Sequence, residues 1–544
     1  MALLFGFLAV FVTWPQARQI SRGVDDFGDP LLNAWTLAWV AHTLPTHPTE
    51  IFNANIFFPE KRTLAYSETL VVPALLVAPV LWLGGGPILA HNLLLLAGYM
   101  LSGLTMYVLV RSLTAHRGAA LVAGVVFALY PYRTEAYAKV QLQLAFWIPA
   151  ALWSLHRLSA EPHARWGALA GLFAALQVYS CVYYGIFAIV PLGIIAMATA
   201  VAAATTSPEN GRGMARALLI GMVVWAAMCA PLVPAYRAAA QVVGERTPED
   251  VQRWSATAPD FLRAHPDNRM YGDPKRPGTG ERRLFPGFVA PALALAAFVP
   301  PISAIPAGVV AYAAAGVISA DFALGFNGVG FRTLYDRVLP FRALRAPARF
   351  AMLVGLSLAV LAGFGTSRLC RGRSTRAQAA IVLLVACAVT LESRNRPLDL
   401  SELPADTPAV YSWLAHQPLG VICEYPVGHL QGRVGPQDAT YMYYSTRHWQ
   451  PMVNGYSGFQ PSSYGELLDR LRSFPDDASV AYLRQRQVSL LLVHSAFYIR
   501  GNFAEDVRRL RRRSDLDWVG EFPAPNGQLT DVFRIGRVAT SVNQ

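Results

Sequence analysis

The stretch PILAHNLLLLAGYMLSGLTMYVLV, from Pro87 to Val110, contains no Asp, Glu, Lys or Arg. As an α-helix it would be about 36 Å long, which exceeds the ~30 Å hydrocarbon core of a bilayer. Comparable apolar runs recur along the first three-quarters of the chain. Only 15% of all residues are charged, against about 25% in soluble globular proteins. The sequence therefore predicts a polytopic α-helical membrane protein.

We expect about 11 or 12 membrane spans from the apolar runs. The N-terminal run has no basic region and no clear cleavage site, so it is interpreted as a membrane helix rather than a signal peptide. Segment 69–84 contains Pro73 and Pro79, and it either spans or enters the membrane and returns. The candidate segments are 1–17, 69–84, 87–110, 118–132, 140–158, 166–184, 186–206, 214–236, 287–300, 302–320, 348–367 and 377–391.

The formal charge of +12 is interpreted as a topology signal rather than as nucleic-acid binding. Basic clusters at Arg111–Arg117, Arg157–Arg165, Arg212–Arg216 and Arg368–Arg376 are expected to be cytoplasmic. Counting spans from these clusters places the remaining long loops and the C-terminal region outside the cytoplasm. The external segments are then 130–143, the loops 237–286 and 321–347, and the C-terminal domain. The first loop 18–68 is also external if 69–84 does not fully cross.

The composition changes after Glu392, and no later apolar run is long enough to cross a membrane. We therefore predict a transmembrane domain over 1–394 and a soluble, extracytoplasmic α/β domain over 395–544. VICEYPV (421–427) and VSLLLVHS (488–495) are typical of buried strands, whereas ASVAYLRQRQ (478–487) and FAEDVRRLRRRSD (503–515) are typical of amphipathic helices. The five cysteines form no CxxC pair, so neither a disulfide nor a zinc site is predicted.

Three acids, Asp25, Asp26 and Asp29, open the first loop just before PLLNAWTLAWVAHTL (30–44). That segment is predicted to be an amphipathic helix in the membrane interface, with His42 among its polar interruptions. Asp29 would suit its N-cap, with Pro30 in the first turn. A cap does not explain the other two acids, and acids near the hydrocarbon boundary are functional candidates.

Further polar candidates come from later segments. Glu68, in YSETL, is either a helix-start residue or a substrate ligand. Arginine binds phosphate oxygens with two donors at once, so basic residues on external segments could hold a phosphate; the alternative is that they anchor the chain at the membrane interface. These candidates are, in three segments, Arg133 and Lys139 with Glu135 between them, then Arg282 and Arg283, and then Arg342, Arg345 and Arg349.

The segment YMYYSTRHWQPMVNGYSGFQPSSY (441–464) is dense in aromatic and amide side chains. Flat aromatic faces with a few polar groups suit a sugar, so His448, Asn454 and Tyr456 are candidate acceptor-binding residues. Ordinary packing at the domain surface is the alternative. No P-loop, Rossmann, nucleophile-elbow or HExxH pattern occurs, and a divalent metal remains an option only if two of the early acids share it.

Several segments together resemble a bacterial group of membrane proteins of the GT-C glycosyltransferase type. They are GDPLLNAWTLAW (28–39), NANIFFPEKRTLAYSE (53–68), LFPGFVA (284–290), RALRAPARF (342–350) and the aromatic segment above. GT-C enzymes, which include the family 39-like protein mannosyltransferases and the lipid A aminoarabinose transferases, use polyprenyl-phosphate sugars. The resemblance implies a multi-pass protein of the bacterial plasma membrane that transfers a hexose or pentose, with inversion, to an external glycan, lipid or protein.

The resemblance also implies a general base in the first external loop. The adjacent Asp-Glu pair usual in the family is replaced by Asp25-Asp26 here, so Asp25, Asp26 and Asp29 all remain candidates. Two other classes of function stay open: a transporter or flippase of a lipid-linked glycan, and a non-catalytic assembly protein of the cell envelope. A transporter would predict charges in mid-span and an internal repeat, but the sequence has few mid-span charges and no obvious repeat.

Overall fold

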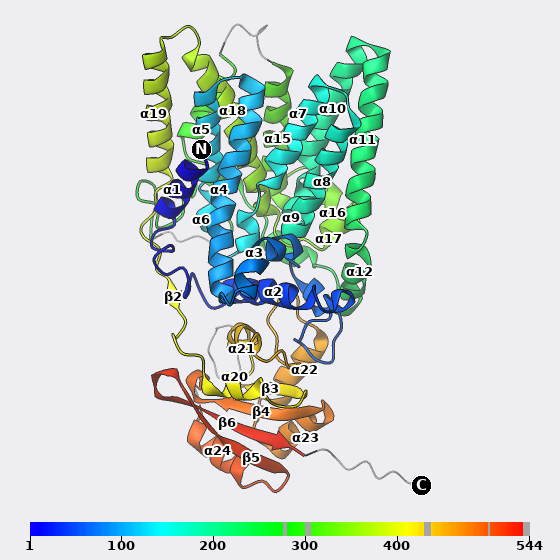
Figure 1. Ribbon diagram of the computed structural model, residues 1–544, viewed down its shortest axis with the longest axis vertical. Helices are drawn as coiled ribbons and strands as arrows, with labels where there is room; N and C mark the ends of the chain where they lie inside the picture. The colour runs from blue at the N-terminus through cyan, green and yellow to red at the C-terminus, as the bar shows by residue number, and fades with distance from the viewer. Residues whose placement is uncertain (276–279, 300–305, 429–436, 499–500, 537–544) are drawn as a thin grey trace. The chain divides into compact units, whose positions relative to one another are not determined.

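The computed structural model describes residues 1–275, 280–299, 306–428, 437–498 and 501–536 (Figure 1). The described chain is mostly helical and has a small sheet region near its C-terminus. It forms two compact units, each assembled from segments far apart in the sequence. The first unit contains Met1–Arg18, Leu93–Val233 and Glu245–Asp399, and the second contains Gln19–Asn92, Pro234–Gly244 and Leu400–Gln544.

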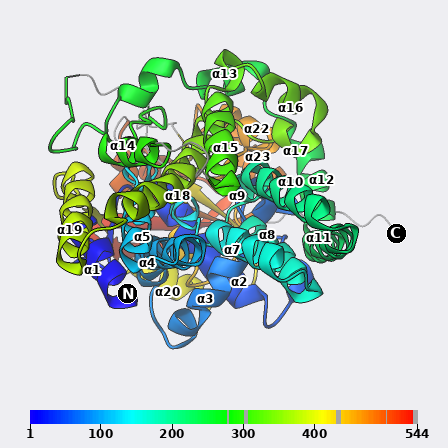
Figure 2. The ribbon, with the colours of Figure 1, turned by 90° about the horizontal axis from the view of Figure 1, so that it is seen from above.

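The first unit is a bundle of helices, and its longer helices lie side by side (Figures 1 and 2). The longer helices are α1 (Ala2–Val12), α4 (Pro87–Thr114, whose first turns belong to the second unit), α5 (Arg117–Ala128), α7 (Trp147–Ala160), α8 (Ala164–Ser180), α10 (Ile189–Thr206), α11 (Pro208–Cys229), α15 (Ala307–Ala323), α18 (Ala351–Cys370) and α19 (Thr375–Glu392). The shorter ones are α6 (Tyr132–Glu135), η3 (Val140–Gln143), α9 (Val182–Phe187), α13 (Pro248–Arg253), η4 (Ala258–Leu262), α14 (Val289–Ala296), η6 (Gly325–Asn327), α16 (Phe331–Arg337), α17 (Leu339–Arg342) and η7 (Pro347–Phe350).

Among the described residues, five helical segments are long and apolar enough to cross a membrane, which indicates a membrane protein. They are Pro87–Thr114, Val182–Thr205, Pro208–Cys229, Pro347–Cys370 and Thr375–Glu392. Other predicted spans correspond to shorter helices. Segment 69–84 forms α3 (Val71–Trp82), which at about 1.5 Å per residue reaches about 18 Å and cannot cross a bilayer alone. Part of 302–320 and the end of 287–300 lie outside the described residues.

Burial separates the central from the peripheral helices of this unit. In the segment containing α18, 83% of the apolar 18-residue stretch is buried inside the protein. In α19 only 11% of the corresponding stretch is buried. Helix α19 exposes Leu383, Leu384 and Leu391 along its length. A helix that is apolar on its exposed side is suited to contact with lipid rather than water.

Glycine permits a close helix contact in the first unit, between α8 and α11. A Cβ atom added to Gly167 would lie 1.9 Å from the Ala217 carbonyl oxygen, and one added to Gly171 would lie 2.0 Å from the Gly221 oxygen. The spacing Gly167-x-x-x-Gly171 is the small-residue pattern that lets membrane helices approach closely.

The second unit joins an N-terminal segment to the C-terminal region. Its elements before residue 400 are β1 (Gly23–Val24), α2 (Asp29–Thr43), η1 (Pro48–Glu50), η2 (Thr63–Tyr66), α3 and most of α12 (Leu232–Val243). The later elements are β2 (Ser401–Glu402), α20 (Ala409–Leu414), β3 (Val421–Tyr425), α21 (Gln437–Ser445), α22 (Ser462–Arg470), α23 (Asp477–Gln485), β4 (Val488–His494), η8 (Ser495–Phe497), α24 (Phe503–Arg511), β5 (Leu516–Ala524), η9 (Pro525–Gly527) and β6 (Gln528–Ile535).

A four-stranded sheet in the order β3-β4-β6-β5 forms the centre of the C-terminal region (Figure 1). β3 and β4 run parallel, and β4, β6 and β5 are antiparallel neighbours. Leu490 and Leu492 face a core that includes Tyr411 of α20 and Tyr441 of α21. The predicted strands 421–427 and 488–495 and both predicted helices are confirmed, and helices cover the sheet as in an α/β fold.

Helix α2 differs from its prediction in two ways. Residues 30–41 are all buried, and the helix packs on α3 and α21 of the same unit, so its apolar side chains contact protein; its place in the membrane interface stays a prediction. The helix also begins at Asp29 itself, after Gly28, so Asp29 is not its N-cap. The sequence pattern did not show this burial because it depends on α3 and α21, which pack on α2 from elsewhere in the chain.

Candidate functional site

A buried carboxylate organises the polar interior of the first unit. Glu281 is 5% exposed and lies in the left-handed backbone region with φ of 62°. Arg349 binds both of its oxygens, with Nε 2.8 Å from Oε2 and Nη2 2.9 Å from Oε1. The Lys139 Nζ atom lies 3.2 Å from Oε1. A buried acid with two cationic partners, in a conformation unfavourable for its residue type, marks a candidate functional site.

Glu135 holds the backbone at Glu281 in place. Its Oε1 accepts a hydrogen bond from the Glu281 amide, and its Oε2 lies 2.6 Å from the Arg283 Nε. Glu135 ends α6, whereas Glu281 and Arg283 belong to the segment before α14. Residues from two distant segments therefore fix the loop that presents Glu281.

Further positive charge surrounds the ion pair of Glu281 and Arg349. Arg345 lies close enough to influence the charge of Glu281, and Arg246 lies near Arg345. The Arg345 guanidinium stacks 5.4 Å from the Trp254 ring centroid, and no carboxylate among the described residues pairs with it. We call seven residues the basic cluster: Lys139, Arg246, Arg283, Arg345 and Arg349, with Glu135 and Glu281.

The ionisation of the cluster favours a bound anion. Burial alone would raise the pKa of Glu281, but Arg349 and Lys139 hold it well below its ordinary value, so this acid stays charged. Burial raises the pKa of Glu135 to about 7, against the opposing effect of Arg283. Burial and then Arg345 lower the pKa of Arg246 to about 10, so it remains a cation at neutral pH. Positive charge exceeds negative charge in the cluster. Arg345 is half-buried, as are Lys139, Arg246 and Arg283, and its guanidinium has no carboxylate partner among the described residues, so it can bind an anionic ligand.

The cluster draws on all three segments that the sequence offered as phosphate ligands. Lys139 and Glu135 come from the first, Arg283 from the second, and Arg345 and Arg349 from the third. The structure uses two other candidates differently. Arg133 is 1% exposed and donates to the carbonyl oxygens of Phe127 and Gln143, and Arg282 pairs with Asp260 at 3.0 Å.

The early acids belong to the second unit. The Asp29 carboxylate accepts a hydrogen bond of 3.0 Å from the Tyr456 hydroxyl. A candidate general base therefore contacts a residue that was a candidate for binding the acceptor substrate. The Asp26 carboxylate accepts from the Gly28 amide at 2.6 Å, a local turn that leads into α2. Asp26 is exposed, whereas Asp25 and Asp29 are half-buried.

The other candidates of this unit take varied positions. His42 is exposed and stacks on Trp449 with ring centroids 4.5 Å apart, and Glu68 is buried. Asn454 is fully buried and bridges the backbone of β3 to Asp438, which is a structural role. Burial lowers the pKa of His448 to about 4, so its ring is neutral at pH 7.

A pocket of about 420 Å³ opens in the second unit, and none of the candidates named from the sequence lines it. Tyr411, His494 and Thr530 line it together with aromatic and proline side chains. Behind it the buried Glu424 carboxylate accepts from the Tyr411 hydroxyl at 2.7 Å and lies 2.9 Å from His494 Nε2, while Thr530 Oγ1 lies 3.0 Å from Nδ1. This hydrogen-bonded floor and apolar wall suit an uncharged polar ligand.

Sequence reasoning missed Glu281 and Arg246 in the first unit, and Tyr411 and His494 in the second. Glu281 is one charge in a polar loop, and its only signal is its place just before the paired arginines. His494 lies at the end of the predicted strand 488–495, and a polar residue at the end of a strand is a candidate binding residue. No group of three or more His, Cys, Asp and Glu side chains able to hold a metal ion occurs within the described ranges.

Comparison with models of known protein families gives no match, and comparison with curated proteins finds no similar sequence.

Proposed function

We propose that this chain is an integral membrane glycosyltransferase of the GT-C type in the bacterial plasma membrane. It would transfer a sugar from a polyprenyl-phosphate donor to an extracytoplasmic glycan, lipid or protein, with inversion at the anomeric carbon. The fold class, the substrate and the sidedness are parts of this proposal. Five helices of membrane-spanning length support a lipid-borne donor.

The observation that carries the proposal is the basic cluster of the first unit. Arg345 brings a guanidinium without a carboxylate partner to a centre where Arg349 and Lys139 are already held by Glu281. Guanidinium groups bind phosphate oxygens through two parallel hydrogen bonds, and their charge stabilises a departing phosphate. The donor phosphate is therefore assigned to Arg345, with Arg246 adding to the positive field.

The base is assigned to Asp29, with Asp26 and Asp25 as alternatives. The carboxylate takes the proton of an acceptor hydroxyl, whose oxygen forms a bond to the anomeric carbon. The bond from that carbon to the phosphate oxygen breaks at the same time, and the polyprenyl phosphate leaves with the bonding electron pair. The Tyr456 hydroxyl donates a hydrogen bond to the Asp29 carboxylate and so fixes its direction.

The first test measures sugar transfer in membranes that contain Arg345→Gln, Arg345→Lys or the unchanged chain. A panel of polyprenyl-phosphate hexoses and pentoses serves as donors. Loss of a charge-assisted phosphate contact of about 1.5–3 kcal/mol should reduce kcat/KM about 10- to 100-fold in Arg345→Gln, with a smaller loss in Arg345→Lys.

The matched control is Arg337→Gln, which removes an exposed arginine of the same unit. Transfer at the unchanged rate in Arg345→Gln would refute the phosphate assignment. Asp29→Asn and Asp26→Asn test the base separately, because loss of a general base should lower kcat about 10²- to 10⁴-fold. If neither these variants nor Asp25→Asn slows transfer, the assignment of the base to this loop is wrong.

A further inference from the structure

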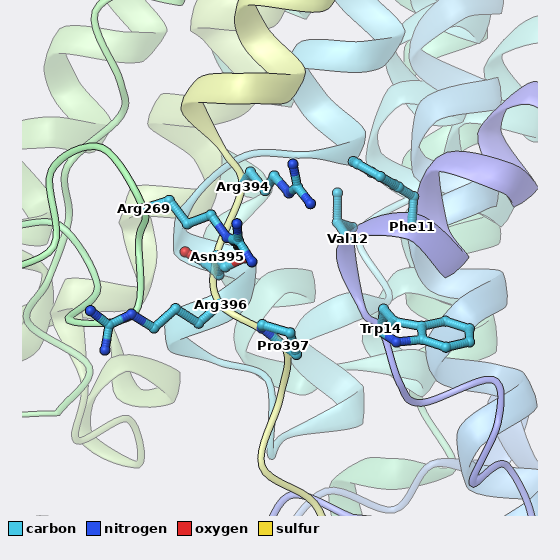
Figure 3. Close-up of a pocket in the computed structure, with 8 residues that line it drawn as sticks. All are labelled: Phe11, Val12, Trp14, Arg269, Arg394, Asn395, Arg396 and Pro397. Atoms are coloured by element: carbon cyan, nitrogen blue, oxygen red, sulfur yellow. Dashed lines mark hydrogen bonds between the residues drawn. The ribbon is translucent and has the colours of Figure 1, made fainter.

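A second positively charged site lies at one edge of the first unit, between α1 and the segment after α19. A pocket of about 180 Å³ lies there. Figure 3 shows the residues that line it, with Phe11, Val12 and Trp14 on one side and Arg269 and the residues after α19 on the other. Figures 1 and 2 both place α1 beside α19. No residue of the basic cluster lines this pocket.

Backbone hydrogen bonds hold the arginines of this pocket in place. The Arg269 amide donates to the Arg394 carbonyl at 3.0 Å, and the Arg396 amide donates to the Asp267 carbonyl at 2.8 Å. The two segments therefore form a short antiparallel ladder, with Asn268 opposite Asn395. The site is part of the fold rather than a chance meeting of two loops.

The side chains of this pocket leave positive charge without a carboxylate partner. Arg269 and Arg394 extend toward Phe11 and Val12, whereas Arg396 extends away from them (Figure 3). The Arg394 guanidinium lies 5.3 Å from the Phe11 ring centroid, and the Arg269 Nε donates to the Asn395 carbonyl at 3.3 Å. No acid among the described residues pairs with Arg269 or Arg394.

Glu392 is near in sequence, but it does not neutralise these arginines. Its Oε1 accepts from the Phe288 amide and, at 3.3 Å, from the Tyr271 hydroxyl. Its Oε2 accepts from the Val289 amide at 3.1 Å. Two guanidinium groups that line one pocket without a counter-charge repel each other, so an anion between them would stabilise the site.

The helices beside the pocket present apolar side chains outward. Helix α1 exposes Leu3 at 91% and Phe7 at 63%, and α19 exposes Leu391 at 56%. Trp14, which is 48% exposed, marks the end of α1, and tryptophan prefers the level of the lipid headgroups. Acyl chains can therefore lie along the helices while a headgroup reaches the arginines.

We infer that this pocket binds the phosphate of an anionic membrane phospholipid. Arg269 and Arg394 hold the phosphate oxygens, and the acyl chains lie against Phe7, Phe11 and Leu391. A simple anchor at the end of a membrane helix would account for Arg394 alone, but not for Arg269, which another loop brings to the same place. The inference does not depend on the proposed transferase activity.

The test uses the purified full chain in maltoside micelles and measures its unfolding temperature by tryptophan fluorescence. Added phosphatidylglycerol should raise this temperature by about 3 °C at saturation. The variant Arg269→Gln/Arg394→Gln should lose most of that rise, and Arg269→Gln alone, at an exposed residue that the fold tolerates, should require about tenfold more lipid.

The control pair Arg373→Gln/Arg376→Gln removes the same charge from the opposite end of α19 and should keep the full rise. An equal rise in the Arg269→Gln variants and in the unchanged chain would overturn the inference. Inorganic phosphate at the same concentration separates the two sources of phosphate. If it produced the same rise as the lipid, the site would bind a free anion, and the lipid assignment would be wrong.

Discussion

At the residue scale, Glu281 illustrates why charge is tolerated in the interior of the first unit. Its side chain and that of Arg349 are 6% and 5% exposed and share two hydrogen bonds. Removing one partner of such a pair leaves the other charge buried and unpaired. The Glu281→Gln variant should therefore lose about 3–5 kcal/mol of unfolding free energy, measured by denaturant titration in detergent.

Two comparisons identify the cause of that loss. Glu209→Gln changes an exposed carboxylate in the first turn of α11 and should alter the unfolding free energy by less than about 0.5 kcal/mol. Adding Arg349→Met to Glu281→Gln removes the unpaired charge and should recover part of the stability. A Glu281→Gln variant as stable as the unchanged chain would show that the ion pair contributes no net stability.

Glu135 should make stability depend on pH near neutrality. Burial raises its pKa to about 7 in the folded chain, above the ordinary value of 4.5. The folded state thus binds the proton more tightly, and this contribution is complete below about pH 4.5 and lost as pH rises through about 7. The difference in unfolding temperature between Glu135→Gln and the unchanged chain should therefore grow in favour of the variant from pH 5 to pH 8. A constant difference would contradict the raised pKa.

The sequence pointed to several cluster residues but not to the acid at its centre. Lys139, Arg345 and Arg349 stood out because basic side chains in these polar segments could hold a phosphate. Glu281 could not be selected, since its burial and its left-handed backbone depend on Glu135, nearly 150 residues earlier. Which charges become paired is a long-range property that spacing along the chain does not encode.

At the element scale, the contact between α8 and α11 depends on the absence of side chains. In Gly171→Ala the new methyl group would meet the Gly221 carbonyl, so the helices must separate, at a cost of about 1–3 kcal/mol. The unfolding temperature in detergent should fall accordingly. Gly193→Ala is the matched control, because a Cβ atom at that position of α10 meets nothing within 4 Å and stability should not fall. Equal effects of the two substitutions would contradict the packing argument.

Elements were predictable where the signal is local and strong. The apolar runs 87–110, 348–367 and 377–391 and the strands at 421–427 and 488–495 became helices and strands close to the expected bounds. The surroundings of α2 were not predictable. Its aromatic side chains would suit either lipid or protein, and only α3 and α21, which pack on it, decide between the two.

At the scale of the whole molecule, the proposed function requires that the first loop and residues 368–376 lie on opposite sides of the membrane. In a variant lacking the five cysteines, Asp26→Cys should react with a membrane-impermeant maleimide added outside the plasma membrane, and Arg373→Cys should not. Both positions are exposed, so burial does not limit the reaction. Labelling of position 26 only from the cytoplasmic side would exclude transfer to an external acceptor by these acids.

The composition of the two units lay beyond sequence reasoning. Hydropathy separates apolar from polar segments, but it does not say which polar segments associate. The structure joins Gln19–Asn92 to Leu400–Gln544 through contacts such as the Phe57 amide donating to the Asn454 carbonyl at 2.9 Å. Such pairings depend on side chains and backbone groups nearly 400 residues apart.

This pairing has a consequence for biogenesis. At about 5–20 residues per second, a ribosome needs roughly 20 to 80 s to travel from Phe57 to Asn454. During that interval the nascent Asp29–Thr43 helix lacks the chain that later covers it, although its tryptophans and leucines are already made. A bilayer surface or a chaperone must shelter them until translation nears its end, and a chain stopped at residue 399 would expose them permanently to quality-control proteases.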